Sequence, residues 1–145
     1  MAGLLVAALG AAAEGAAPAL RGLAAAGGRC WAVGDAATVL VSDDGGASWR
    51  GLPCPIEGDL QSVVAGERVW AFGGRAEAGN PFALDEGVLL AGDAGAEALE
   101  ALPAPPTGRL YGGAFFERAG AAFGQACPDA PGGLWRTVTA PGNWQ

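Results

Sequence analysis

The sequence predicts an all-β fold built from about three similar units of short strands. Glycine and proline supply 26 and 10 of the 145 residues, which limits helices and is typical of a chain with many turns. Residues 20–34, LRGLAAAGGRCWAVG, recur as LQSVVAGERVWAFG at 60–73 and, more loosely, as LYGGAFFERAGAAFG at 110–124. Repetition at about 40 to 50 residues indicates a repeated β-architecture.

The N-terminal segment, residues 1–19, is expected to form the outer half of a unit whose inner half is absent. GLLVAALGAAAEGAAPAL aligns with GVLLAGDAGAEALEALPA at 87–104. An alanine-rich helix is the alternative, because alanine has the highest helix propensity.

The units at 20–55 and 60–105 each contain two predicted hairpins. The first hairpin turns at 27–28 in one unit and at 66–67 in the other, and glycine adopts the positive φ of such turns without steric cost. The second is TVLVSDDGGASWRGL or GVLLAGDAGAEALEAL, in which a Gly/Asp turn separates two β-rich runs. The unit at 110–145 is incomplete: a hairpin turning at 117–118 is followed only by GGLWRTV.

Four short strands per 40 to 50 residues is the period of a β-propeller blade. We therefore expect one domain, residues 1–145, forming a partial β-propeller of about three four-stranded blades with a half-blade at the N-terminus. A propeller ring typically has at least about four blades. Either oligomerisation completes a ring, or the chain is a fragment of a longer propeller, or the sheets stack as an open arc.

The stretch VLVSDDGGASW, residues 39–49, contains the pattern S-x-D-x-G-x-x-W at Ser42, Asp44, Gly46 and Trp49. The Asp44 carboxylate can accept hydrogen bonds from the turn's own backbone, glycine permits positive φ, and the indole can cover the turn. These uses predict a structural role. The alternative is a Ca²⁺ site at Asp43 and Asp44, but Ca²⁺ takes about six to eight oxygens, so we expect no metal and no cofactor.

This pattern resembles the Asp-box of BNR-type propeller repeats, which occur in sialidases, in sortilin-like receptor ectodomains and in the propeller that assists photosystem II assembly. The longer stretch WAVGDAATVLVSDDGGASW looks most like a repeat of the photosystem assembly factor type. The second unit keeps Asp93 and Gly95 of the box but has alanine at the Ser and Trp positions, and the third has no box. The resemblance implies a propeller fold and a protein-binding or scaffolding role.

Composition excludes several functions. All 8 basic residues are arginine and the net charge is −7, so a phosphate backbone would be repelled and we expect no nucleic-acid partner. The chain has no histidine, which removes the usual general base and the Ser-His and Cys-His nucleophile pairs. Cys30, Cys54 and Cys127 are widely spaced, and we interpret them as buried apolar residues rather than disulfide or zinc ligands.

The apolar N-terminal run is compared with a secretory signal in order to predict where the protein is located. No basic residue precedes Arg21, so the positively charged part of a secretory signal is missing. A cytoplasmic location is favoured, with export as the alternative if residues 1–13 act as a signal. The run is shorter than the about 20 residues that cross a bilayer, so no membrane span is expected.

The loops on the side opposite the Asp-box turn form the expected binding surface. Insertions gather there at 74–87 and 125–133, and loops tolerate added length where strands do not. The candidates on this surface are mostly acidic and would form a docking patch: Asp35, Glu57, Asp59, Arg75, Glu77, Phe82, Asp85, Glu86, Arg109 and Asp129. Phe82 is the apolar anchor of the set. Trp31 and Trp70, at matching repeat positions, are assigned to packing.

The predicted function is a non-catalytic propeller module that binds or scaffolds another protein. The first alternative is a truncated or degenerate propeller fragment without separate activity, which the incomplete units favour. The second is a sialidase-like glycosidase. That family's pattern needs an arginine triad, a Tyr nucleophile paired with Glu, and an acid Asp, whereas Tyr111, the single tyrosine, is followed by Gly-Gly. We therefore expect no enzymatic activity.

Overall fold

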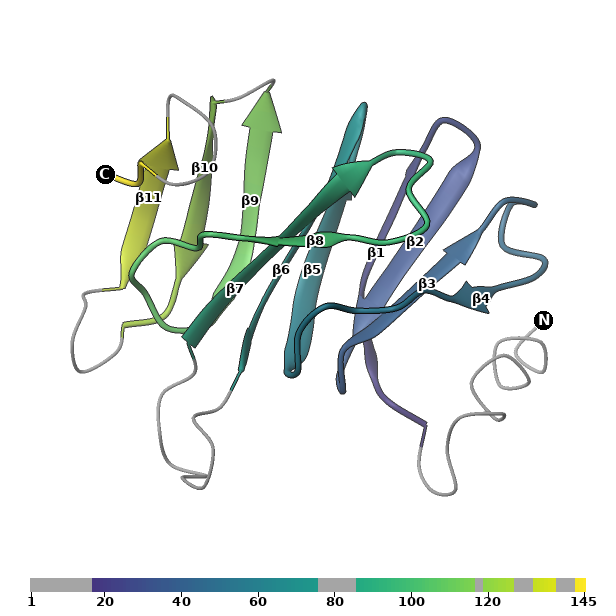
Figure 1. Cartoon of the computed structure of the whole chain (residues 1–145), viewed down its shortest axis with the longest axis horizontal. Coiled ribbons are helices and arrows are strands. Elements are labelled where there is room, and N and C mark those ends of the chain that lie inside the picture. Colours follow the sequence, from purple (N-terminus) through teal and green to yellow (C-terminus); the bar gives the residue numbers. More distant parts are fainter. Residues whose placement is uncertain (1–16, 76–85, 117–118, 127–131, 138–142) are drawn as a thin grey trace.

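The computed structural model describes residues 17–75, 86–116, 119–126, 132–137 and 143–145. Within these residues the chain is all-β: eleven strands form three antiparallel sheets, and there is no helix (Figure 1). The predicted all-β fold of about three sheets is confirmed. The half-blade predicted at 1–19 lies outside the described residues except for 17–19, which have no regular structure.

Each sheet is a meander of strands in chain order. The first sheet contains β1 (Leu20–Ala26), β2 (Arg29–Gly34), β3 (Thr38–Ser42) and β4 (Arg50–Gly51). The middle sheet contains β5 (Asp59–Ala65), β6 (Arg68–Arg75), β7 (Glu86–Asp93) and β8 (Glu100–Leu102). The third sheet contains β9 (Leu110–Phe116), β10 (Ala119–Gly124) and β11 (Gly133–Thr137).

The three sheets stack face to face, with the middle sheet between the other two (Figure 1). Successive residues of β6 point to opposite faces of the middle sheet, so alternate side chains pack against the first and the third sheet. Val69 and Ala71 pack in the core shared with the first sheet. Trp70 and Phe72 pack in the core shared with the third. Burial on both faces explains why β6 and β7 are continuous apolar runs.

The first strands of the three sheets share one irregularity. Pairing skips Arg21 between Leu20 and Gly22 in β1, and it skips Gln61 in β5 and Tyr111 in β9 in the same way. The residue after each skipped position is small, and a side-chain carbon added to Gly22 would lie 2.9 Å from the Cα of Ser62. Adjacent first strands therefore approach closely at this level, which glycine permits.

The last three residues complete part of the third sheet. The backbone of Gln145 exchanges hydrogen bonds of 3.0 and 2.9 Å with that of Arg136 in β11, where a fourth strand would pair. Trp144 turns toward the middle sheet: its indole N–H donates to the carbonyl of Pro103 at 2.9 Å, and its ring meets Phe115 edge-on at 6.2 Å. The C-terminus is thus tied to the linker that precedes β9.

Candidate functional site

Two ends of the stacked sheets carry the turns and loops. We call one end the box face; it contains the turns at 27–28, 43–49 and 94–99. The other end, the loop face, contains the turn at 35–37 and the linkers at 52–58 and 103–109. In an antiparallel meander alternate connections fall on opposite ends. The described binding candidates lie on the loop face: Asp35, Glu57, Asp59, Arg75, Glu86 and Arg109.

On the box face, the turn after β3 is held by its own side chains. The Ser42 hydroxyl donates to Asp44 Oδ1 at 2.8 Å and accepts the N–H of Gly46 at 2.8 Å. Asp44 also accepts the backbone N–H of Ser48 at 2.8 Å and the Ser48 hydroxyl. Trp49 donates its indole N–H to the carbonyl of Gly46 at 3.1 Å. All four residues of the S-x-D-x-G-x-x-W pattern therefore make their hydrogen bonds within the turn.

The electrostatics of this turn follow from those hydrogen bonds. The Ser48 hydroxyl and N–H, with the Ser42 hydroxyl, lower the pKa of Asp44 from 3.8 to about 2. Gly46 has a φ of 91°, a conformation that side chains disfavour. Among the described residues no group of three or more Asp, Glu, Cys or His side chains is placed to hold a metal ion.

The corresponding turn of the middle sheet is simpler. Asp93 ends β7 opposite Arg68, and its carbonyl accepts the N–H of Ala96 at 2.9 Å. Gly95 stands in open space. With alanine in place of Ser and Trp, this turn lacks the partners that surround Asp44.

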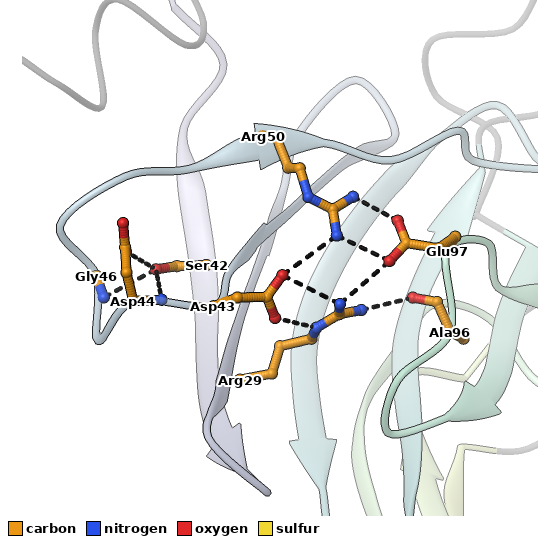
Figure 2. Close-up of polar contacts among 8 residues, drawn as sticks. All are labelled: Arg29, Ser42, Asp43, Asp44, Gly46, Arg50, Ala96 and Glu97. Atoms are coloured by element: carbon orange, nitrogen blue, oxygen red, sulfur yellow. Dashed lines mark hydrogen bonds and ion pairs between the residues drawn. The ribbon is translucent and has the colours of Figure 1, made fainter.

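A four-residue charge network joins the two turns across the first and middle sheets (Figure 2). Arg29, whose side chain is mostly buried, donates to Asp43 at 2.6 Å, to Glu97 at 3.1 Å and to the carbonyl of Ala96 at 2.8 Å. Arg50 donates to Glu97 at 2.8 Å and to Asp43 at 3.3 Å. The two arginines lower the pKa of Glu97 from 4.5 to about 2. We call these four residues the box-face clasp.

On the loop face, the acidic candidates Asp35 and Asp59 are paired rather than free. Asp35 accepts a hydrogen bond from Arg21 at 2.9 Å, and Arg21 lowers the pKa of that carboxyl. Asp59 accepts the backbone N–H of Ala36 at 2.9 Å and lies 3.7 Å from Arg109. The expected acidic patch is therefore interleaved with arginine in this part of the chain.

The turn at 35–37 has a strained backbone. Ala36 and Ala37 have φ values of 53° and 55°, a region that residues other than glycine seldom adopt. The next sheet's linker holds them there, because Asp59 accepts the N–H of Ala36 and the carbonyl of Gly58 accepts the N–H of Ala37 at 2.6 Å. Such strain persists only where surrounding contacts enforce it.

A cavity of about 330 Å³ lies at the loop-face ends of β6 and β7. Arg75 and Glu86, an ion pair of 2.7 Å, stand at its edge, and Ile56 and the proline-rich stretch 103–106 line it. Glu57 is exposed in the adjoining linker, next to Ile56. The remaining candidates lie outside the described residues: Glu77, Phe82, Asp85 and Asp129.

Arg21, Gln61 and Tyr111 also lie toward the loop face, although none of them was among the predicted binding residues and Tyr111 was considered only as a candidate nucleophile. They are the skipped residues at the start of the three first strands, where a bulge redirects a side chain. The Tyr111 hydroxyl donates to the side-chain oxygen of Gln125 at 2.9 Å. The signal was present as the repeated pattern L-x-small at residues 20–22, 60–62 and 110–112.

The two repeat tryptophans and Cys54 contribute to packing, but Cys30 and Cys54 are not fully buried, contrary to the prediction. Cys30 and Cys54 are free thiols and are partly buried, and burial raises the pKa of the Cys54 thiol. Cys127 lies outside the described residues. Trp31 and Trp70 are buried, one in each inter-sheet core.

No helix in the described part of the chain is long and apolar enough to cross a membrane.

The fold defined by these sheets is part of a propeller-like architecture. No family model matches the chain, and no curated protein sequence matches it. Solved structures resemble it, among them two of YCF48. One, YCF48 bound to D1 peptide, has a TM-score of 0.66 at 20% identity, covering 88% of this chain and 40% of that one. The other, YCF48 from Cyanidioschyzon merolae, has a TM-score of 0.62 at 16% identity, covering 88% and 39%. The chain therefore spans about 40% of the length of these propellers.

Proposed function

We propose that this chain is a non-catalytic propeller-type module that binds a segment of another protein on its loop face. One observation carries the proposal: the chain shares its fold with a YCF48 structure that holds a D1 peptide. The turn after β3 is proposed to be an Asp-box that serves the fold, since its side chains are used within the turn.

The loop face supports the choice of surface. Its turn at 35–37 is held in a strained conformation by contacts from the next sheet, so it is rigid before any partner arrives. On the same face, the 330 Å³ cavity is lined by polar and apolar groups in similar measure, with the charged pair Arg75 and Glu86 at its edge. A concave surface that offers both apolar contact and a few polar groups suits the binding of a peptide segment.

Peptide binding can be tested directly. A displayed library of random peptides would be selected against the immobilised chain, and the enriched peptides and the D1 peptide would be titrated by calorimetry. We expect one enriched class whose affinity falls about tenfold or more in Arg75→Ala. Arg50→Ala is the matched control, because Arg50 is an equally exposed arginine paired with a glutamate on the box face.

Two results would count against the proposal. If Arg50→Ala weakened binding while Arg75→Ala did not, the loop face would be the wrong surface. If no peptide were enriched, the second candidate function would be favoured, a propeller portion without separate activity. The coverage of about 40% of the similar structures is the observation that supports this second candidate.

A further inference from the structure

The outer face of the third sheet is apolar and uncovered. Phe116 on β9, Phe123 on β10 and Leu134 on β11 are 78%, 49% and 75% exposed. Strand pairing places them on one face, because Phe123 lies opposite Leu134, and Phe116 lies opposite Ala119, which points the same way as Phe123. Phe123 and Leu134 adjoin at one end of this face, and Phe116 stands at the other end with Ala119 and Ala121 between them. Large apolar side chains gathered on one exposed face are typical of an interaction surface.

In the other two repeats, the corresponding face is covered by another sheet. Phe123 occupies the position of Phe72 in the middle sheet and of Val33 in the first, three aligned residues that precede a glycine. Phe72 is buried against the third sheet and Val33 against the middle sheet. In both cases the residue packs on the sheet that follows.

The opposite end of the stack is different. On the outer face of the first sheet, Ala32 and Leu40 alternate with residues of the inner core and are only 2% and 3% exposed. Leu23 is 71% exposed there, as a single residue. The described chain thus has one open apolar sheet face, at the end marked by β9–β11 in Figure 1.

We propose that a second copy of this chain covers this face, so that two third sheets pack against each other about a two-fold axis. A surface that pairs with itself gives a closed dimer, whereas head-to-tail packing would need an open face at both ends. The face suits such pairing, because Ala114, Ala119 and Ala121 lie among its large residues. If the two-fold axis runs across the strands, the strands of the two copies point in opposite directions. Phe116 of each copy then packs against Phe123 and Leu134 of the other.

Charge and area set the expected strength of the dimer. No described residue on this face is acidic, and Arg136 is the charged residue among them. Each copy carries a net charge of −7, so salt should favour the dimer by screening the repulsion between copies. The exposed parts of the three large side chains amount to a few hundred Å² per copy, which is less than the about 600 Å² per partner of the smaller stable interfaces and is typical of a weak dimer. The dimer should therefore be concentration-dependent.

The test is the solution mass measured by light scattering and sedimentation from micromolar to near-millimolar protein. We expect a shift from 14.2 kDa to twice that mass as concentration rises, and at lower concentration in higher salt. Leu134→Glu and Phe123→Glu should hold the chain at 14.2 kDa. Leu23→Glu, the same change at an equally exposed leucine on the first sheet, should leave the dimer intact.

Two outcomes would overturn the proposal. A cooperatively melting wild-type chain of 14.2 kDa throughout would show that no second copy covers the face. Loss of the dimer in both Leu23→Glu and Leu134→Glu would indicate head-to-tail assembly instead. Circular dichroism melts at the lowest concentration identify folded variants, and Leu134→Gln and Phe123→Ser replace any glutamate variant that unfolds.

Discussion

Trp70 and Phe115 stack face to face, with ring centroids 3.8 Å apart and planes inclined by 9°. Trp70 comes from the middle sheet and Phe115 from the third, so the pair spans the interface between them. Glycine makes room for it: a side-chain carbon at Gly120 would meet the Phe115 ring. The second inter-sheet core therefore depends on aromatic contacts, which are stabilising beyond their area in stacked geometry.

Removing one ring of this pair should destabilise the fold. We expect Phe115→Ala to lower the free energy of unfolding by about 2–4 kcal/mol, because it leaves a cavity beside Trp70. The control is Phe116→Ala, the next residue, whose side chain points to solvent. Urea denaturation of both variants, at concentrations where the chain is monomeric, measures the difference. Equal losses would show that the stacked pair does not hold the two sheets together.

The glycine that ends W-A-F-G should not tolerate a side chain. A carbon added at Gly73 would clash with the carbonyl oxygen of Asp59 and lie 2.9 Å from the Cα of Leu60. We expect Gly73→Ala to cost about 2 kcal/mol through this overpacking. Gly51→Ala, where a side-chain carbon meets nothing within 4 Å, is the control and should melt close to the wild type. A wild-type melting temperature for Gly73→Ala would contradict the close approach of β5 to β6 at Gly73.

Acid should weaken the box face within a defined pH range. The pKa of Glu97 falls from 4.5 to about 2 and that of Asp44 from 3.8 to about 2 on folding. Their stabilisation is complete above the unfolded values and is lost as pH falls toward 2, because the unfolded chain binds more protons there. We expect melting temperatures that are flat from pH 7 to about 5 and then decline.

The contribution of Glu97 to the loss of stability in acid can be measured separately. Glu97→Gln should reduce the slope of melting temperature against pH between about 4.5 and 2, whereas Glu67→Gln, an equal change of charge in the turn between β5 and β6, should preserve it. Identical slopes for the two variants would remove Glu97 from the acid response.

Removing Arg29 from the box-face clasp should destabilise the fold more than removing an ordinary surface arginine. Arg29 donates to Asp43, Glu97 and the carbonyl of Ala96, and its side chain is mostly buried. We expect Arg29→Ala to cost about 2 kcal/mol, since charge-assisted hydrogen bonds are lost together with packing. Arg75→Ala removes one exposed pair and should cost little. A double-mutant cycle of Arg29→Ala with Glu97→Gln should show coupling, and additive losses would refute a shared network.

Much of the fold could be predicted from the sequence because the repeat and the alternation of apolar residues are local. The runs at 29–34 and 68–75 form strands, and the glycines at 27–28 turn with φ values of 60° and 83°. The third unit was expected to be incomplete, and its sheet has three described strands. Tertiary contacts were not predicted, such as Trp144 donating to Pro103, 41 residues away.

Charge pairing at the candidate site was not predicted, because it depends on which strand ends meet. Asp35 and Asp59 were expected to be part of an acidic surface, yet arginines and backbone donors from neighbouring elements take up their carboxylates. The clasp illustrates the same point, since Arg29 and Glu97 are 68 residues apart in the chain. No local pattern indicates such a pair.

By itself, the sequence determined the all-β class, the number of sheets and the turn chemistry around Asp44, because strand alternation, glycine turns and side-chain capping act within a few residues. Only the tertiary structure decided which charges neutralise one another, where the loop-face cavity opens, and that Phe123 is exposed while Phe72 at the same repeat position is buried. The physical reason is that burial and ion pairing depend on the sheet that stacks alongside, and residues distant in the chain supply that sheet.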